Sequence, residues 1–269
     1  MIFDWDYLFS LFSLSEFWWA SWTVVKLSIA SWVLSNIVGF ILALAQGSTY
    51  PILKIPAKLY IWLFRSLPLL VLLIFVYNMP QIIPATGVVL SNPFAAGLIA
   101  MVLCESAYVA EIHRGGLLSV SKGQKEAAQA LGIRFVGIQQ LVIIPQAIRI
   151  ALPALTNEFI SIVKLTSLVS VISLTEVLLV GQRLYTQNFL VLETMAAVAI
   201  YYVFIVTVFD FLLKRLESFL DVTKNKHTRQ PSETFTQQVN EAPQPKIIPV
   251  AESDYQHYKP LGCTKPTTT

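Results

Sequence analysis

The chain has 269 residues, of which 55% are hydrophobic and only 13% are charged, about half the charged fraction of a typical soluble domain. Its net charge of +3 at pH 7 is too small to indicate a nucleic-acid partner. Most of the charged residues lie between long apolar stretches or in the last quarter of the chain. Because lipid hydrocarbon excludes charge, this distribution argues against a soluble protein and predicts an all-α integral membrane protein embedded in a lipid bilayer.

The N-terminal segment 1–16 is acidic and aromatic, which fits a periplasmic or interfacial position. It lacks the basic start and the short apolar core of a cleavable signal peptide, so we expect the first apolar stretch to be retained. Five apolar stretches are then long enough to cross a bilayer, for which about 20 residues suffice. They cover residues 22–46, 57–77, 93–112, 152–173 and 189–213, within a predicted transmembrane domain at 17–221.

Prolines predict where these helices are interrupted, because proline lacks a backbone N–H and clashes with the preceding turn. We expect Pro68 to kink or break the second span. Pro145 and Pro153 are expected to break the chain before the fourth span, in a stretch that also contains a shorter helix outside the membrane.

Among the connections between successive spans, those rich in lysine and arginine alternate with those that have few or none. The connection 78–92 has none, and the connection between the fourth and fifth spans has only Arg183. The positive-inside rule therefore predicts the N-terminus outside and the C-terminus in the cytoplasm. Residues 222–269 are polar and poor in apolar side chains, which predicts a disordered cytoplasmic tail.

The connection 114–145 contains a predicted cytoplasmic helix. Ser121 and Gln124 have the spacing of a capping box at its start, and Gly132 lies where a helix stop is expected. Small side chains along it would let it enter a narrow groove on a partner: Ala127, Ala128 and Ala130. From these signals alone, a capped connector helix is the simpler interpretation.

The residues of this connection also resemble a known motif. Glu126-Ala127-Ala128, Gly132, Val142 and Ile144-Pro145 have the spacing of the EAA loop of membrane subunits of ATP-binding-cassette (ABC) importers. Four other segments are similar to the polar amino-acid branch of that family, the group of histidine, glutamine and arginine permeases: 64–69, 107–124, 157–160 and 164–172. The departures from the family pattern are small. The family often has proline where this chain has Ser121, and it usually has isoleucine and leucine where this chain has Val142 and Ile144. The resemblance covers residues 15 to 215.

The resemblance implies the five-helix permease fold of a type I ABC importer in the bacterial inner membrane. It also implies a second permease subunit, identical or paralogous, together with a dimer of ABC ATPases and an extracytoplasmic solute-binding protein. The residues that would couple this chain to the ATPase are Glu126, Ala127, Ala128, Gly132 and Arg134. The chain has no Gly-x-x-x-x-Gly-Lys-Ser/Thr motif, so we expect ATP and Mg²⁺ in the partner ATPase. We expect no cofactor, metal or catalytic residue in this chain, which would be a transport subunit and not an enzyme.

Charged residues inside a bilayer are functional candidates because they are costly to place there. If the fourth span is helical, Glu158 and Lys164 lie about 120° apart around its axis and about 9 Å apart along it, with Ser161 between them. We hypothesise that Glu158 binds the cationic group of an amino acid and Lys164 its carboxylate. The alternative is an internal ion pair that holds span four to its neighbours.

Tyr108 and Glu105 lie one turn apart on the same face of the third span. Residues 104–108 read Cys-Glu-Ser-Ala-Tyr, where the family commonly has Asn-Ser-Ala-Ala-Tyr. An extra carboxylate in the cavity would favour cationic amino acids, unless Glu105 is paired with Arg65. We interpret Arg65 as a snorkelling residue near the cytoplasmic face, or as a gating residue grouped with Pro68 and Pro145.

Two other classes of protein remain to be weighed. An ion-gradient-driven secondary amino-acid transporter often has inverted repeats, and none is visible here. A membrane-embedded enzyme would need a catalytic or metal-binding cluster, whereas two of the three histidines lie in the tail and His113 stands alone at the end of a span. The sequence therefore favours a permease for polar amino acids.

Overall fold

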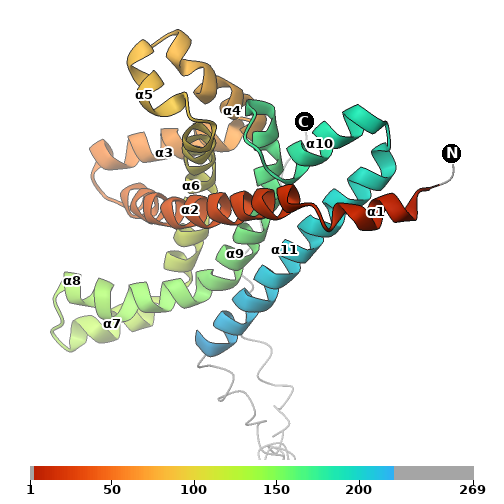
Figure 1. Cartoon of the computed structure of the whole chain (residues 1–269). Coiled ribbons are helices and arrows are strands. Elements are labelled where there is room, and N and C mark those ends of the chain that lie inside the picture. Colours follow the sequence, from red (N-terminus) through yellow and green to blue (C-terminus); the bar gives the residue numbers. More distant parts are fainter. Residues whose placement is uncertain (1–2, 221–269) are drawn as a thin grey trace, which may run out of the picture. The chain divides into compact units, whose positions relative to one another are not determined.

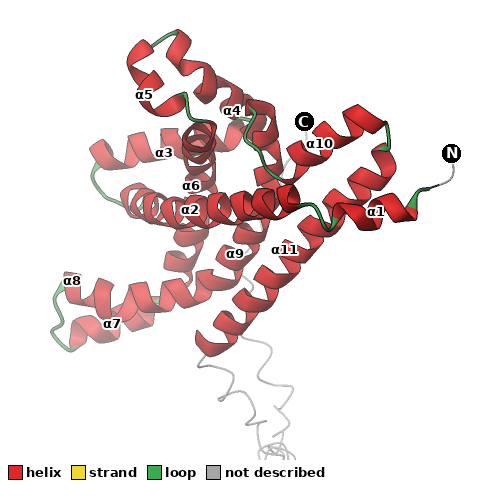
Figure 2. Cartoon of the chain, viewed as in Figure 1, coloured by secondary structure: helices red, strands yellow, loops and turns green. Residues whose placement is uncertain are grey.

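The computed structural model describes residues 3–220, and its elements are all helical (Figures 1 and 2). The first half contains α1 (Trp5–Leu11), α2 (Ser15–Gln46), α3 (Pro51–Ser66), α4 (Leu69–Asn78), η1 (Met79–Gln81), η2 (Pro84–Thr86), α5 (Gly87–Leu90) and α6 (Pro93–Ser119). The second half contains α7 (Lys122–Ala130), α8 (Phe135–Ile138), η3 (Gln139–Ile143), α9 (Ile144–Leu165), η4 (Thr166–Ile172), α10 (Val177–Asn188) and α11 (Val191–Leu220). The predicted tail at 222–269 lies outside the described residues.

Four helical stretches within residues 3–220 are long and apolar enough to cross a membrane: Ser15–Gln46, Pro93–Ser119, Phe135–Ile172 and Val191–Ser218. The helices Pro51–Ser66 and Leu69–Gln81 meet the same criteria together, as a pair bent by 104°. When the bent pair is counted as one span, the predicted five-span, all-α fold is confirmed. The predicted shorter helix outside the membrane corresponds to α10, which lies between the fourth and fifth spans.

The bend between α3 and α4 has a local cause. Pro68 disfavours the helical conformation for the residue before it, and Leu67 is extended, with φ −86° and ψ 132°. Pro68 itself is extended and serves as the N-cap of α4. The predicted break at Pro68 is confirmed, so the second span consists of two helices instead of one continuous helix over 57–77.

The predicted breaks at Pro145 and Pro153 are wrong. Pro145 is the second residue of α9, in the first turn, where a missing N–H costs little, and the π-helical segment η3 ends two residues before it. A π-helical turn pairs each N–H with the carbonyl five residues back, which gives the wider local geometry that accommodates the ring. Pro153 lies inside α9, and the packing of α9 against α6 holds the helix together despite the lost hydrogen bond.

Small side chains allow α2 and α6 to pack closely along each other (Figure 1). On α2 these are the buried Ser28, Ser31 and Ser35, followed by Gly39. A Cβ atom at Gly39 would lie 2.8 Å from Val109 Cγ1 and 2.9 Å from the Ser106 carbonyl oxygen. Position 39 therefore has no room for a side chain at this helix crossing.

We expect Gly39→Leu to lower the stability of the permease domain by about 1–3 kcal/mol, because the added side chain meets backbone that cannot move aside. The measurement is thermal unfolding of the purified protein in detergent. Gly115→Leu is the matched control, since a Cβ at Gly115 of α6 has nothing within 4 Å. Equal melting temperatures for the two variants would contradict the packing argument.

A buried carboxylate holds the start of α10 against α11. Glu176 is 0% exposed and accepts hydrogen bonds from Leu178 N (2.8 Å), Leu179 N (2.7 Å) and the Tyr202 hydroxyl (2.7 Å). Burial raises the pKa of Glu176 above its usual range, and the three hydrogen bonds, which favour the charged form, offset only part of this effect. The carboxylate therefore serves both as the helix cap and as the link to α11.

The raised pKa predicts a pH dependence of stability. The folded chain holds the Glu176 proton more tightly than the unfolded chain, so this contribution is fully present below the ordinary glutamate pKa and is lost as pH rises through the folded pKa. We expect Glu176→Gln to lower stability by about 1–3 kcal/mol and to remove this pH-dependent loss. Thermal unfolding across mildly acidic to neutral pH measures both effects, with the exposed Asp6→Asn as control. A pH profile of Glu176→Gln that parallels the unmodified chain would show that another group is responsible.

Candidate functional site

Two acidic side chains meet where α6 packs against α9. Glu105 on α6 is only 2% exposed, and its carboxyl group lies close to that of Glu158 on α9, which is half-buried. The two helices are extensive packing partners, which explains why residues 53 positions apart meet. Two adjacent carboxylates repel each other, so this pair favours the binding of an organic cation.

The end of α3 completes the same region. Pro68 ends α3, so the carbonyl groups in the last turn of α3 have no hydrogen-bond partners within the helix. The Phe64 carbonyl accepts a hydrogen bond from Cys104 Sγ (3.7 Å), and the Arg65 carbonyl accepts one from the Tyr108 hydroxyl (3.4 Å). The helix break therefore anchors α3 to the acidic face of α6.

The Arg65 guanidinium lies over the Tyr108 ring, with its Cζ atom 5.4 Å from the ring centroid. This is a cation–π contact, and the predicted alternative ion pair with Glu105 is not formed. Among the described residues, the ion pairs are Arg114–Glu111 (2.7 Å) and Lys214–Asp210 (2.8 Å). Arg65 therefore lies against Tyr108, which is one turn along α6 from Glu105, and no carboxylate of the described residues forms an ion pair with it.

The structure does not bring Lys164 to Glu158. Lys164 is exposed in the last turn of α9, and no ion pair joins it to Glu158 in the part of the chain that is described. The Ser161 hydroxyl donates to the Asn157 carbonyl within its own helix (3.2 Å). Glu158 thus faces Glu105, and among the described residues neither Glu158 nor Lys164 forms an ion pair that would hold span four to its neighbours. The proposed contacts of Lys164 and Ser161 with substrate stay predictions.

The predicted cytoplasmic helix is present as α7, but its cap differs from the prediction. Ser121 is the N-cap residue without a side-chain hydrogen bond, and the Gln124 N–H is bonded to the Ser121 backbone carbonyl instead (3.2 Å). The predicted stop at Gly132 is confirmed, because Gly132 has a φ of +73°. Gly132 N donates to the Gln129 carbonyl (2.9 Å) and Ile133 N to the Ala128 carbonyl (3.2 Å), which is the Schellman pattern.

The coupling candidates divide into two faces. Ala128 is buried in a small cluster with Ile138 and Ile143 that holds α7 against the chain that follows it, so it is not available to a partner. Glu126, Ala127 and Arg134 are exposed, and so are the apolar side chains of Leu131 (79%) and Phe135 (63%). Leu131 and Phe135 were not predicted, because only the fold of the α7–α8 hairpin shows that they point away from the chain.

Tyr60 is a further polar contact that the sequence does not reveal. Its hydroxyl donates to the Leu103 carbonyl (3.0 Å) and lies 2.9 Å from the Ser106 hydroxyl. Both partners are on α6, beside Glu105, and the contact depends on how α3 crosses α6. A tyrosine in an apolar helix carries no local signal for such a partner.

Comparison with known proteins identifies the architecture. Residues 35–222 match the family described as "Binding-protein-dependent transport system inner membrane component". This chain belongs to that family. The permease is 35% identical over 202 residues to the octopine transport system permease protein OccM of Rhizobium radiobacter, a match that covers 73% of this chain and 81% of the relative. It is 38% identical over 162 residues to the glutamine transport system permease protein GlnP of Escherichia coli K12, which covers 60% and 73% of the two chains.

Solved structures agree with this assignment. The permease aligns with a chain from the structure described as "Crystal structure of an amino acid ABC transporter with histidines", with 32% identity and a TM-score of 0.73. The alignment covers 81% of this chain and 99% of that one. An inward-facing structure of the methionine transporter MetNI, at 19% identity and a TM-score of 0.64, supports the fold alone.

The chain is therefore a permease subunit of an ABC importer and a multi-pass inner-membrane protein. ATP is hydrolysed by a separate subunit of such a transporter. Membership of the family also implies a binding-protein partner and another permease subunit.

Proposed function

We propose that this permease transports polar amino acids and prefers those with a cationic side chain. The contact between Glu105 and Glu158 carries this proposal, because it places two carboxyl groups together inside the helical bundle. A guanidinium or ammonium group of a substrate relieves their mutual repulsion and forms charge-assisted hydrogen bonds with them. The relatives named for octopine and glutamine, and the solved amino-acid transporter with histidines, support the broader class of amino acids.

The remaining polar groups match the other end of an amino acid. Arg65 and Tyr108 lie next to the acidic pair and offer a guanidinium and a hydroxyl to the substrate carboxylate. An arginine fork suits a carboxylate because it donates two parallel hydrogen bonds. Lys164 and Ser161, on the same helix as Glu158, remain candidates for the same group. In this arrangement the substrate contacts α6, α9 and the end of α3.

The same proposal includes the orientation and the partners. The N-terminus faces outside, the coupling segment 114–145 and the tail face the cytoplasm, and the extracytoplasmic solute-binding protein delivers the amino acid. Two ABC ATPases, which bind ATP and Mg²⁺, receive α7 from this chain and from an identical or paralogous permease. α7 moves with the ATPase because it is short, sharply ended at Gly132, and braced by the cluster around Ala128.

Co-purification with a candidate ATPase, followed by reconstitution with the binding protein, tests the proposed function. We expect arginine, lysine or histidine to stimulate ATP hydrolysis and uptake more strongly than glutamine, glutamate or cystine. Stronger stimulation by a neutral or acidic amino acid would contradict the cationic preference alone. Uptake at an unchanged rate without any ATPase would contradict the importer itself and favour an ion-gradient-driven transporter.

A further inference from the structure

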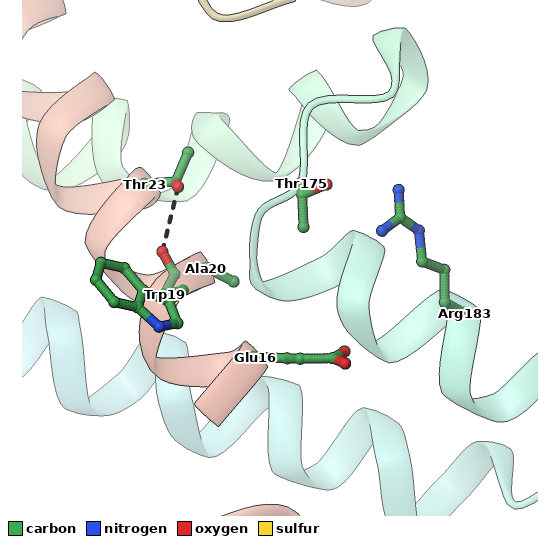
Figure 3. A pocket seen from close by; sticks show the side chains of 6 residues that line it. All are labelled: Glu16, Trp19, Ala20, Thr23, Thr175 and Arg183. Carbon is green, nitrogen blue, oxygen red and sulfur yellow. Dashed lines mark hydrogen bonds between the residues drawn. The ribbon is translucent and has the colours of Figure 1, made fainter. Parts of the chain in front are cut away.

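A pocket with polar lining residues lies between the beginning of α2 and the segment formed by α10 and the loop before it (Figure 3). Its volume is about 390 Å³, and its lining residues are Glu16, Trp19, Ala20, Thr23, Thr175 and Arg183. None of these residues belongs to the Glu105–Glu158 region. A pocket of this size falls within the range of small-molecule sites in proteins.

The pocket presents one negative and one positive side chain. Glu16 extends from the first turn of α2 and Arg183 from α10, and both lie at the same opening (Figure 3). They are not joined by an ion pair, and neither side chain is hydrogen-bonded to another of the described residues. Thr175 also lines the pocket, from the loop before α10, whereas Trp19 lies on the side of Glu16 that is away from Arg183 (Figure 3). An exposed charge is usually only solvated, but two opposite charges that share a pocket without pairing leave room for a ligand with both charges.

The topology places this pocket at the end of the permease opposite to α7. α2 is the first span, and successive spans alternate in direction across the membrane, so its N-terminal end lies on the same side as the connection after the fourth span. Thr175 and Arg183 belong to that connection. α7 follows the third span and therefore lies on the other side. In the proposed orientation, the pocket opens toward the compartment from which the substrate arrives.

We propose that this pocket is an outer vestibule site that binds the zwitterionic backbone of a free amino acid before it reaches the Glu105–Glu158 region. Glu16 binds the α-ammonium group, and Arg183 binds the α-carboxylate through its planar fork. The proposal deepens the proposed function and rests on it, since it assigns a second site on the route of the same substrate.

The two sites would bind different parts of the substrate. The vestibule holds groups that every α-amino acid carries, so it binds amino acids with little regard to their side chains. The acidic pair in the bundle selects the side-chain cation. Binding in the vestibule raises the local substrate concentration at the entrance, so its loss is expected to raise the KM of uptake and leave the maximal rate nearly unchanged.

Direct binding to the purified permease–ATPase complex, without binding protein, tests the vestibule. The probes are L-arginine, L-glutamine, agmatine, which lacks the carboxylate, and N-acetyl-arginine, which lacks the ammonium group. We expect millimolar binding of both amino acids and at least about tenfold weaker binding of both analogues. Glu16→Gln and Arg183→Gln should each weaken amino-acid binding at least about tenfold. Asp6→Asn and Gln187→Ala, which change exposed residues outside the pocket, serve as controls.

The outcomes separate this proposal from the proposed function. If Glu158→Gln weakens binding while Glu16→Gln and Arg183→Gln bind like the unmodified chain, the vestibule is wrong and the proposed function stands. If the vestibule variants weaken docking of the binding protein but leave binding of the free amino acid intact, the pocket is a protein contact and the vestibule is again wrong. If the intact transporter imports no amino acid, the proposed function itself fails.

Discussion

Substitution of Glu158 by glutamine is expected to weaken the affinity for a cationic amino acid about 10- to 100-fold, while the protein remains in the membrane. The neutral amide removes a charge-assisted hydrogen bond, which contributes about 1.5–3 kcal/mol. It also ends the repulsion with Glu105, so a cation is no longer needed between the two groups. The measurements are the KM of uptake and the substrate concentration that half-stimulates ATP hydrolysis in the reconstituted transporter.

Two further variants make this result interpretable. Glu105→Gln should reduce the preference for cationic over neutral amino acids, since it removes only the buried carboxylate. Lys164→Met tests the separate prediction that Lys164 binds the substrate carboxylate. Basal ATP hydrolysis reports whether the complex is assembled. An unchanged substrate affinity in Glu158→Gln would exclude the acidic pair from the substrate site.

Replacement of Gly132 by valine should reduce uptake at least about tenfold without loss of the permease from the membrane. Gly132 has a φ of +73°, a conformation that costs a β-branched residue about 1–3 kcal/mol. A Cβ at this position meets nothing within 4 Å, so the effect comes from backbone strain and not from a clash. The strain opposes the Schellman end of α7, and a distorted α7 cannot move as a rigid unit with the ATPase.

Gly123→Val is the matched control for this prediction. Gly123 lies in the same helix, also has open space around its Cβ position, and does not have a positive φ. The comparison requires uptake, substrate-stimulated ATP hydrolysis and the amount of each variant in the membrane. Normal uptake by Gly132→Val would argue against the role of this helix end in coupling.

Local features of the molecule were predictable because they depend on neighbouring residues. A run of about 20 apolar residues has few alternatives to a spanning helix, since lipid leaves backbone groups without partners. The break at Pro68 follows from the geometry of proline, and the end of α7 at Gly132 follows from the ability of glycine to adopt a positive φ. Periodicity also placed Glu105 and Tyr108 one turn apart on one face.

Contacts between helices were decided only by the tertiary structure. The charge pattern of span four placed Glu158 and Lys164 at one opening, as binders of the two ends of an amino acid, but it did not reveal that the packing of α6 against α9 places Glu158 beside Glu105. Side-chain spacing along one helix does not tell which neighbouring helix will cover a given face. Which helix covers it depends on how α3 and α9 pack against α6. For the same reason Ala128 is turned toward its own chain, and α9 continues through Pro153 where local propensity predicted a break. The sequence by itself determined the spans, the helix ends and the family motifs, whereas the set of charged groups that share one site was determined by packing between distant segments.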